Sequence, residues 1–206
     1  MSLSTDQFIE LLSGGRETRG VEFKAAGPRG DPLVFAFVAR AVLAMSNLQL
    51  GGWVLLGIQD DGQMSGLLQD DLASWLEHDE VTASLNAYAD PFVLVDVERV
   101  DYEGKSFIAI RVHEFAEVPV LARKDSPAKS GGRLVIRQGG CYVRPRLKPQ
   151  ALRCQHRLKC VNSWTLLQTR CCGAFLLERV PPASLSRHQR ATHKSMRNSS
   201  EVSGDL

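Results

Sequence analysis

Residues 47–62 read NLQLGGWVLLGIQDDG, and this stretch decides the fold. It combines a glycine pair at Gly51-Gly52, an apolar run from Trp53 to Ile58 and an acidic turn at Asp60-Asp61-Gly62. An unbroken apolar run of this kind is typical of a strand that is buried on both faces, and an Asp-Gly pair favours a hairpin turn. The stretch therefore predicts a central strand that ends in paired carboxylates.

The segments around this strand alternate between helical and extended patterns. Apolar residues recur at helical spacing in residues 5–12, 33–48 and 72–89, which predicts three helices. Strand patterns occupy residues 21–24, 92–100 and 105–112, and a last hairpin is predicted for residues 133–137 with 141–144. Because helices are mixed with mostly hairpin-linked strands, we expect an α+β fold with a mixed, mostly antiparallel sheet and packed helices.

The composition changes near residue 150. Residues 1–150 contain 16 Lys and Arg against 20 Asp and Glu, whereas the remaining residues contain 9 against 3. Four of the five cysteines also lie beyond residue 150, and the apolar periodicity is lost there. We therefore expect a domain over residues 1–149 and a low-order basic tail, rich in Cys, Arg and Ser, over residues 150–206.

Two hypotheses address the tail. Cys154, Cys160, His188 and His193 offer metal-binding side chains, but the cysteines are too far apart for a zinc finger and no ββα core accompanies them. The alternative is an out-of-frame translation, because residues 152–167 read one base later can encode an ordinary amphipathic helix. The encoding DNA distinguishes the two.

Composition also limits the location and the partners. The chain is 44% apolar, but no apolar run approaches the roughly 20 residues of a membrane span. The first ten residues are polar, unlike a signal peptide, and five cysteines without such a signal argue against a disulfide framework. We therefore expect a cytoplasmic protein with no membrane partner.

Several motifs occur in order along residues 10–148. They are Glu17 with Glu22-Phe23-Lys24, the stretch from Asn47 to Gly62, Val118-Pro119-Val120 and Tyr142-Val143-Arg144. Together they resemble the Schlafen-type AlbA-like domain, a module often described as DNA-binding, whose members range from transcription regulators to nucleases. The resemblance implies a nucleic-acid-binding module, for DNA or RNA, in a regulatory or defence-linked protein.

The resemblance also implies an acidic site. In the nuclease members, three carboxylates form the active site, and they match Glu17, Glu22 and Asp60 here. Such a trio could bind Mg²⁺ or Mn²⁺ and activate water for RNA cleavage, which would make the chain a metal-dependent endoribonuclease. This requires the strands at residues 21–24 and 53–58 to be antiparallel, and we expect that orientation. Solvated turn residues are the alternative for Asp60.

Basic residues gather near the end of the first 150 residues. Residues 133–148 contain no acid, and their cations are Arg133, Arg137, Arg144, Arg146 and Lys148. Tyr142 could stack on a base, and Lys24 could contact a phosphate or pair with an acid. The alternative for this segment is a solvated hairpin. A separate hypothesis for the whole domain is a protein–protein interaction module or a homo-oligomer.

Overall fold

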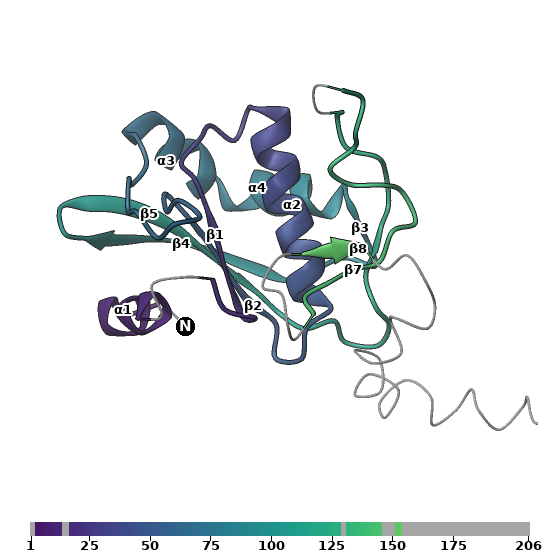
Figure 1. Cartoon of the computed structure of the whole chain (residues 1–206), viewed down its shortest axis with the longest axis horizontal. Helices are drawn as coiled ribbons and strands as arrows, with labels where there is room; N and C mark the ends of the chain where they lie inside the picture. The colour runs from purple at the N-terminus through teal and green to yellow at the C-terminus, as the bar shows by residue number, and fades with distance from the viewer. Residues whose placement is uncertain (1–2, 14–16, 129–130, 146–150, 154–206) are drawn as a thin grey trace, which may run out of the picture. The chain divides into compact units, whose positions relative to one another are not determined.

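The computed structural model describes residues 3–13, 17–128, 131–145 and 151–153 (Figure 1). In chain order the helices and strands are α1 (Thr5–Leu12), β1 (Val21–Lys24), α2 (Pro32–Ser46), β2 (Gly52–Leu56), α3 (Gln69–Leu76), α4 (His78–Asn86), β3 (Ala89–Asp90), β4 (Val95–Tyr102), β5 (Lys105–Val112), β6 (Leu121–Ala122), β7 (Tyr142–Val143) and β8 (Leu152–Arg153). The predicted α+β class is confirmed. The predicted tail lies outside the described residues from residue 154 onward.

The main sheet has the strand order β1-β2-β5-β4. β2 pairs in parallel with β1, while β5 pairs antiparallel with both β2 and β4. Two small antiparallel sheets, β3-β6 and β7-β8, complete the pairing. The predicted central strand is confirmed, because β2 lies between two partners and Val54, Leu55 and Leu56 are fully buried.

The sheet separates two hydrophobic cores. Val54, Leu56 and Ile110 point into the core that contains α2, α3 and α4. Leu55 and Ala109 point into a smaller core that contains Phe8 of α1. Alternate strand residues point to opposite faces, so α1 and α2 cover opposite sides of the sheet, as Figure 1 shows.

The orientation expected for β1 and β2 is wrong. They are parallel, with Glu22 opposite Val54 and Lys24 opposite Leu56. The cause is α2, whose 15 residues carry the chain about 22 Å back along the sheet before β2 begins. Parallel neighbours require such a crossover, whereas a short turn would have given an antiparallel pair.

Local chemistry fixes both ends of α2. The Asp31 carboxylate accepts hydrogen bonds from the main-chain N–H groups of Leu33 and Val34, at 2.7 and 3.2 Å. After the helix, Gly51 has a positive φ of 68°, and a Cβ there would lie 2.0 Å from the Val112 oxygen. Gly52 is as constrained, since its Cβ would lie 2.3 Å from the Met45 sulfur. The glycine pair therefore lets the chain enter β2 directly beside β5.

Two other predicted elements differ in the structure. The helix expected over residues 72–89 is two helices, α3 and α4, because Glu77 leaves helical geometry with ψ of 75°. This break directs Trp75 and Val81 into one core. The hairpin expected around residues 138–140 is absent from the described residues. The main-chain N–H groups of Val135 and Ile136 donate to the Ser126 hydroxyl instead of to a partner strand.

β7 instead pairs with β8, which lies past the predicted end of the domain at residue 149. Ala151, just before β8, is also buried in the larger core. Across the described ranges, every helix is too short or too polar to cross a bilayer.

Candidate functional site

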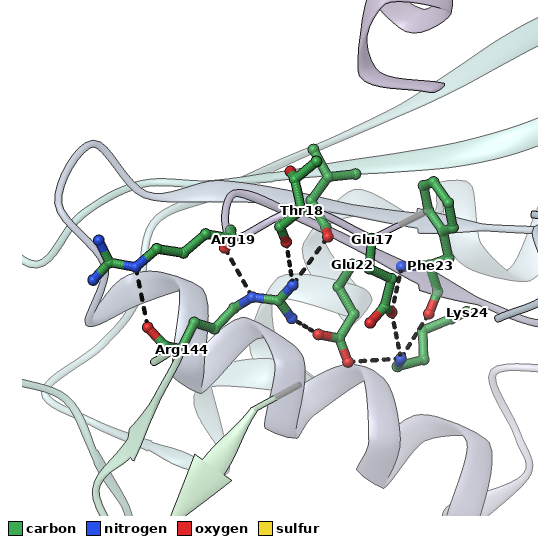
Figure 2. A network of polar contacts seen from close by, with 8 residues as sticks. Glu17, Thr18, Arg19, Glu22, Phe23, Lys24 and Arg144 are labelled. Carbon is green, nitrogen blue, oxygen red and sulfur yellow. Dashed lines mark hydrogen bonds and ion pairs between the residues drawn. The ribbon is translucent and has the colours of Figure 1, made fainter. Parts of the chain in front are cut away.

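The candidate site forms on β1, the edge strand that carries the Glu-Phe-Lys motif. Val21 and Phe23 point into the core on the α1 side, so the alternation of the strand directs Glu22 and Lys24 toward α2 (Figure 2). Glu17 lies just before the strand, and its carboxylate accepts a hydrogen bond of 3.0 Å from the Phe23 main-chain N–H. Two acids and one lysine thereby gather on a single short segment.

Glu22 is a buried carboxylate with a cation on each oxygen. Only 3% of its surface is exposed. Its Oε1 lies 2.7 Å from the Lys24 ammonium, and its Oε2 forms an ion pair with Nη1 of Arg144. A buried carboxylate is stable only when it is paired and hydrogen-bonded in this way.

Arg144 approaches Glu22 from beyond β7. Its Nε donates to the Arg19 carbonyl oxygen at 2.8 Å, and its Nη2 donates to the carbonyl oxygens of Thr18 and Val21 at 2.5 and 3.0 Å (Figure 2). Burial lowers the pKa of Arg144 to about 10, against the opposing effect of the Glu17 charge. The guanidinium is therefore still protonated at neutral pH.

This geometry corrects the predicted role of Arg144. Its side chain is fully buried, so no guanidinium surface is left to contact a phosphate. Tyr142 is corrected for the same reason, because it is 3% exposed and its hydroxyl accepts a hydrogen bond from the Arg137 main-chain N–H at 2.8 Å. Both side chains are buried, and their hydrogen bonds stabilise the segment around β7.

Lys24 lies beside two of the three predicted acids. Its ammonium is 2.7 Å from Glu22 and 3.8 Å from Glu17, and it donates to the Phe23 carbonyl oxygen at 2.6 Å. Burial lowers the pKa of Lys24, while the charges of Glu17 and Asp60 oppose that shift. Asp60 itself is exposed on the turn after β2. The structure thus brings two of the three predicted acids, Glu17 and Glu22, to one lysine.

The acids do not form a metal site in this arrangement. Both oxygens of Glu22 are paired with cations, and Glu17 faces Lys24 and a main-chain N–H. In the part of the chain that the structure describes, no three acidic, histidine or cysteine side chains are grouped so that they could hold a metal ion. Mg²⁺ and Mn²⁺ require carboxylate oxygens that are free to coordinate, so these residues do not fit either ion. A catalytic role for the trio stays a prediction.

Of the predicted phosphate-binding cations, two remain on the surface. Arg133 and Arg137 are exposed in the segment before β7. Arg146 and Lys148 lie outside the described residues. Lys24 is partly exposed. Its ammonium group pairs with Glu22, which is one of the two roles predicted for it.

Sequence reasoning missed Arg40, which is the one charged residue in α2. Its guanidinium lies 5.5 Å from the centre of the Phe37 ring, and its Nε is buried without a hydrogen-bond partner among the described residues. Burial lowers the pKa of Arg40, the Arg133 charge lowers it further, and Glu17 opposes both. A single charge in an otherwise apolar helix was the available signal, since such a residue has to face a polar partner or water.

The comparisons with known proteins agree with this architecture. The family model described as Schlafen, AlbA_2 matches residues 17–145. Among solved structures, the DIP2311 protein from Corynebacterium diphtheriae is similar with 20% identity and a TM-score of 0.51, over 81% of this chain and 28% of that chain. The N-terminal domain of a RecG-related protein from Nitrosomonas europaea is 23% identical with a TM-score of 0.40, over 67% of this chain and 89% of that chain. The likeness to DIP2311 concerns the fold alone. The search of curated proteins finds no match.

Proposed function

The chain belongs to the Schlafen, AlbA_2 family, and from this premise we propose that it binds nucleic acid through a cationic surface formed by Arg40 and Arg133, beside the acid-paired Lys24. The observation that carries the proposal is the Nε of Arg40, which is buried without a hydrogen-bond partner among the described residues while the guanidinium contacts the Phe37 ring. Besides burial, the Arg133 charge lowers the pKa of Arg40, and the Arg40 charge lowers the pKa of Lys24. Like charges held close together are stabilised when an anion lies between them.

Phosphate is the anion that suits this surface. Guanidinium groups donate paired hydrogen bonds to phosphate oxygens, and each neutralised phosphate releases counterions. Glu17 lies 3.8 Å from Lys24 beside this surface, so a phosphodiester backbone would contact the cations while avoiding that acid. Such a contact involves the phosphate backbone rather than the bases. It therefore supports binding of DNA or RNA with little sequence preference.

The proposal extends to the role of the whole protein. The family includes transcription-regulator modules, and this supports a regulatory or defence-linked role in the cytoplasm. Metal-dependent RNA cleavage by Glu17, Glu22 and Asp60 is the competing function, and the pairing of Glu22 with Lys24 and Arg144 argues against it. The third candidate function is protein–protein interaction, including formation of a homo-oligomer.

One experiment separates these functions. The full chain is mixed with labelled single-stranded RNA, tRNA and duplex DNA, each with Mg²⁺, with Mn²⁺ or with chelator, and both retention and cleavage are measured. We expect retention that does not depend on the metal and falls as salt rises. Metal-dependent cleavage would select the nuclease, and neither retention nor cleavage would select the interaction module.

Variants locate the binding surface. Arg40→Ala and Arg133→Ala should each weaken binding of every sequence and reduce the slope of log affinity against log salt by about one. Arg99→Ala is the matched control, because Arg99 pairs with Asp101 on β4 and is absent from the proposed surface. Unchanged slopes in the first two variants would contradict the proposed surface.

A further inference from the structure

A groove lies on the other face of β1, between that strand and α1. Its volume is about 510 Å³, within the range of about 300–1,000 Å³ that small-molecule sites occupy. α1 contributes Gln7 and Glu10, the segment before β1 contributes Thr18, and β2 contributes Trp53. Val21 also lines the groove, so it opens on the face opposite to Glu22 and Lys24.

Trp53 gives the groove a fixed aromatic wall. The Arg111 guanidinium lies 5.2 Å from the centre of the indole ring, and its Nη2 donates to the Leu50 carbonyl oxygen at 2.9 Å. Arg111 is not among the residues that line the groove, so the indole offers the groove a part that the guanidinium does not cover. An aromatic ring held by a cation is a stacking surface for another planar ring.

The described residues at the rim of the groove carry hydrogen-bonding groups. The Gln7 Oε1 accepts a hydrogen bond from the Ser4 main-chain N–H at 3.0 Å, which leaves the amide N–H groups of Gln7 as donors. Glu10 adds a carboxylate and Thr18 adds a hydroxyl. Among the described residues that line the groove there is no lysine or arginine, and Glu10 would repel a phosphate. A neutral planar ring with donors and acceptors on its edge fits this chemistry.

Part of the groove is formed by residues outside the range that matches the family model. That match begins at residue 17, so α1 and its contribution of Gln7 and Glu10 lie before it. β1 is an edge strand, with Lys24 directed to one face and the groove on the other. To contact both faces, a flexible polymer would pass around this edge, outside Glu17 and Arg144, which bind the β1 main chain.

We propose that the groove between α1 and β1 takes one unstacked nucleobase of a single-stranded nucleic acid, which stacks on Trp53. The backbone of the same strand then lies on the cationic surface of Arg40 and Arg133. This inference rests on the proposed function and adds a base-binding subsite to it. Base stacking on an aromatic residue tolerates every base, so the subsite selects single strands over duplexes.

Tryptophan fluorescence tests the subsite directly in the full chain. A single-stranded oligonucleotide should quench the emission, whereas an abasic oligonucleotide of equal length and charge should bind without quenching it. Trp53→Phe should remove the quenching while the other two tryptophans still emit. Trp53→Ala should weaken oligonucleotide binding roughly 5- to 100-fold and leave abasic binding unchanged. Phe92→Ala is the control, because Phe92 is 72% exposed and does not line the groove.

The outcomes separate this inference from the proposed function. If the oligonucleotide binds, and native protein and Trp53→Phe show equal quenching, the base subsite is overturned while nucleic-acid binding stands. Equal quenching by the abasic strand also overturns the subsite. If neither strand binds at any salt concentration, the proposed function fails and the subsite fails with it. Because Trp53→Phe preserves an aromatic ring in β2, its result does not depend on whether Trp53→Ala folds.

Discussion

Arg19 and Arg144 each donate the Nε hydrogen of the guanidinium group to the main-chain carbonyl oxygen of the other, at 3.1 and 2.8 Å (Figure 2). The two residues are 125 positions apart in the sequence. This reciprocal pair joins the segment before β1 to the end of β7, next to the ion pair of Arg144 with Glu22. The candidate site is therefore assembled from both ends of the domain.

The buried ion pair should dominate the stability of this region. Arg144→Met leaves Glu22 with one cation instead of two, and it should lower the free energy of unfolding by about 3–5 kcal/mol. The double variant Glu22→Met/Arg144→Met should lose less than the sum of the two single variants, because no uncompensated carboxylate is left. Urea unfolding measures the free energy of unfolding of the single and double variants. Arg99→Met, which breaks an exposed pair with Asp101, should lose no more than about 1 kcal/mol.

Substitution of Asn47 should strongly destabilise the folded protein. Its Oδ1 accepts from the Val120 main-chain N–H at 2.8 Å, and its Nδ2 donates to the carbonyl oxygens of Val120, Leu43 and Tyr142 at 2.8, 3.1 and 3.0 Å. Asn47→Ala leaves these buried groups unpaired and should lower the free energy of unfolding by roughly 3 kcal/mol. Asn47→Asp should lose more, since a carboxylate would face three carbonyl oxygens.

Thermal and urea unfolding check this prediction, with Gln49→Ala as the control because Gln49 is exposed two residues further on. An Asn47→Asp variant as stable as the native protein would contradict the hydrogen-bond assignment of the Asn47 amide.

Cys141 should make the protein less stable at alkaline pH. Burial raises the pKa of its thiol from 9.0 to about 11, so the folded state holds the proton more tightly than the unfolded state does. The corresponding stabilisation is complete below pH 9, and it is lost as the pH rises toward 11, by at most about 2–3 kcal/mol. Cys141→Ala should remove this part of the pH dependence. Urea unfolding at pH 8, 9, 10 and 11 compares the two proteins, and parallel curves would count against the raised pKa.

The end of the domain can be tested by two truncations. A fragment that ends at Pro149 lacks β8 and the buried Ala151, whereas a fragment that ends at Arg153 keeps both. The longer fragment should unfold at a Tm about 2–8 °C higher. Circular dichroism during heating measures both transitions. If the two fragments unfold at the same temperature, β8 contributes nothing to stability and residue 149 is an adequate end.

Much of the fold could be predicted from local patterns. The apolar run of β2, the Asp31 cap of α2 and the turn at Glu103-Gly104 between β4 and β5 are encoded within a few residues. The parallel pairing of β1 with β2 was not predictable in this way, because it depends on the path of α2 across the sheet. The break at Glu77 was missed for a related reason, since the helical periodicity continues across it.

The site could be predicted only in outline. The sequence placed Glu17, Glu22 and Lys24 together because they are adjacent along the chain. It could not reveal that Arg144 is buried, since an arginine near other cations also suits an exposed surface. Only the three-dimensional pairing with Glu22 shows which role it has.

The link between Arg144 and residues 18–22 also sets an order of events while the chain is being synthesised. β1 leaves the ribosome early, and Arg144 follows only after β5 is complete, as domains emerge from their N-terminal end. Until then Glu22 has only Lys24 as a cation, so burial of its carboxylate against α2 is less favourable. We therefore expect β1 to dock last, onto a β2-β5-β4 sheet that can already have formed. A nascent or prematurely terminated chain that ends before Arg144 would expose an unpaired strand edge on β2, the kind of surface that chaperones and proteases recognise.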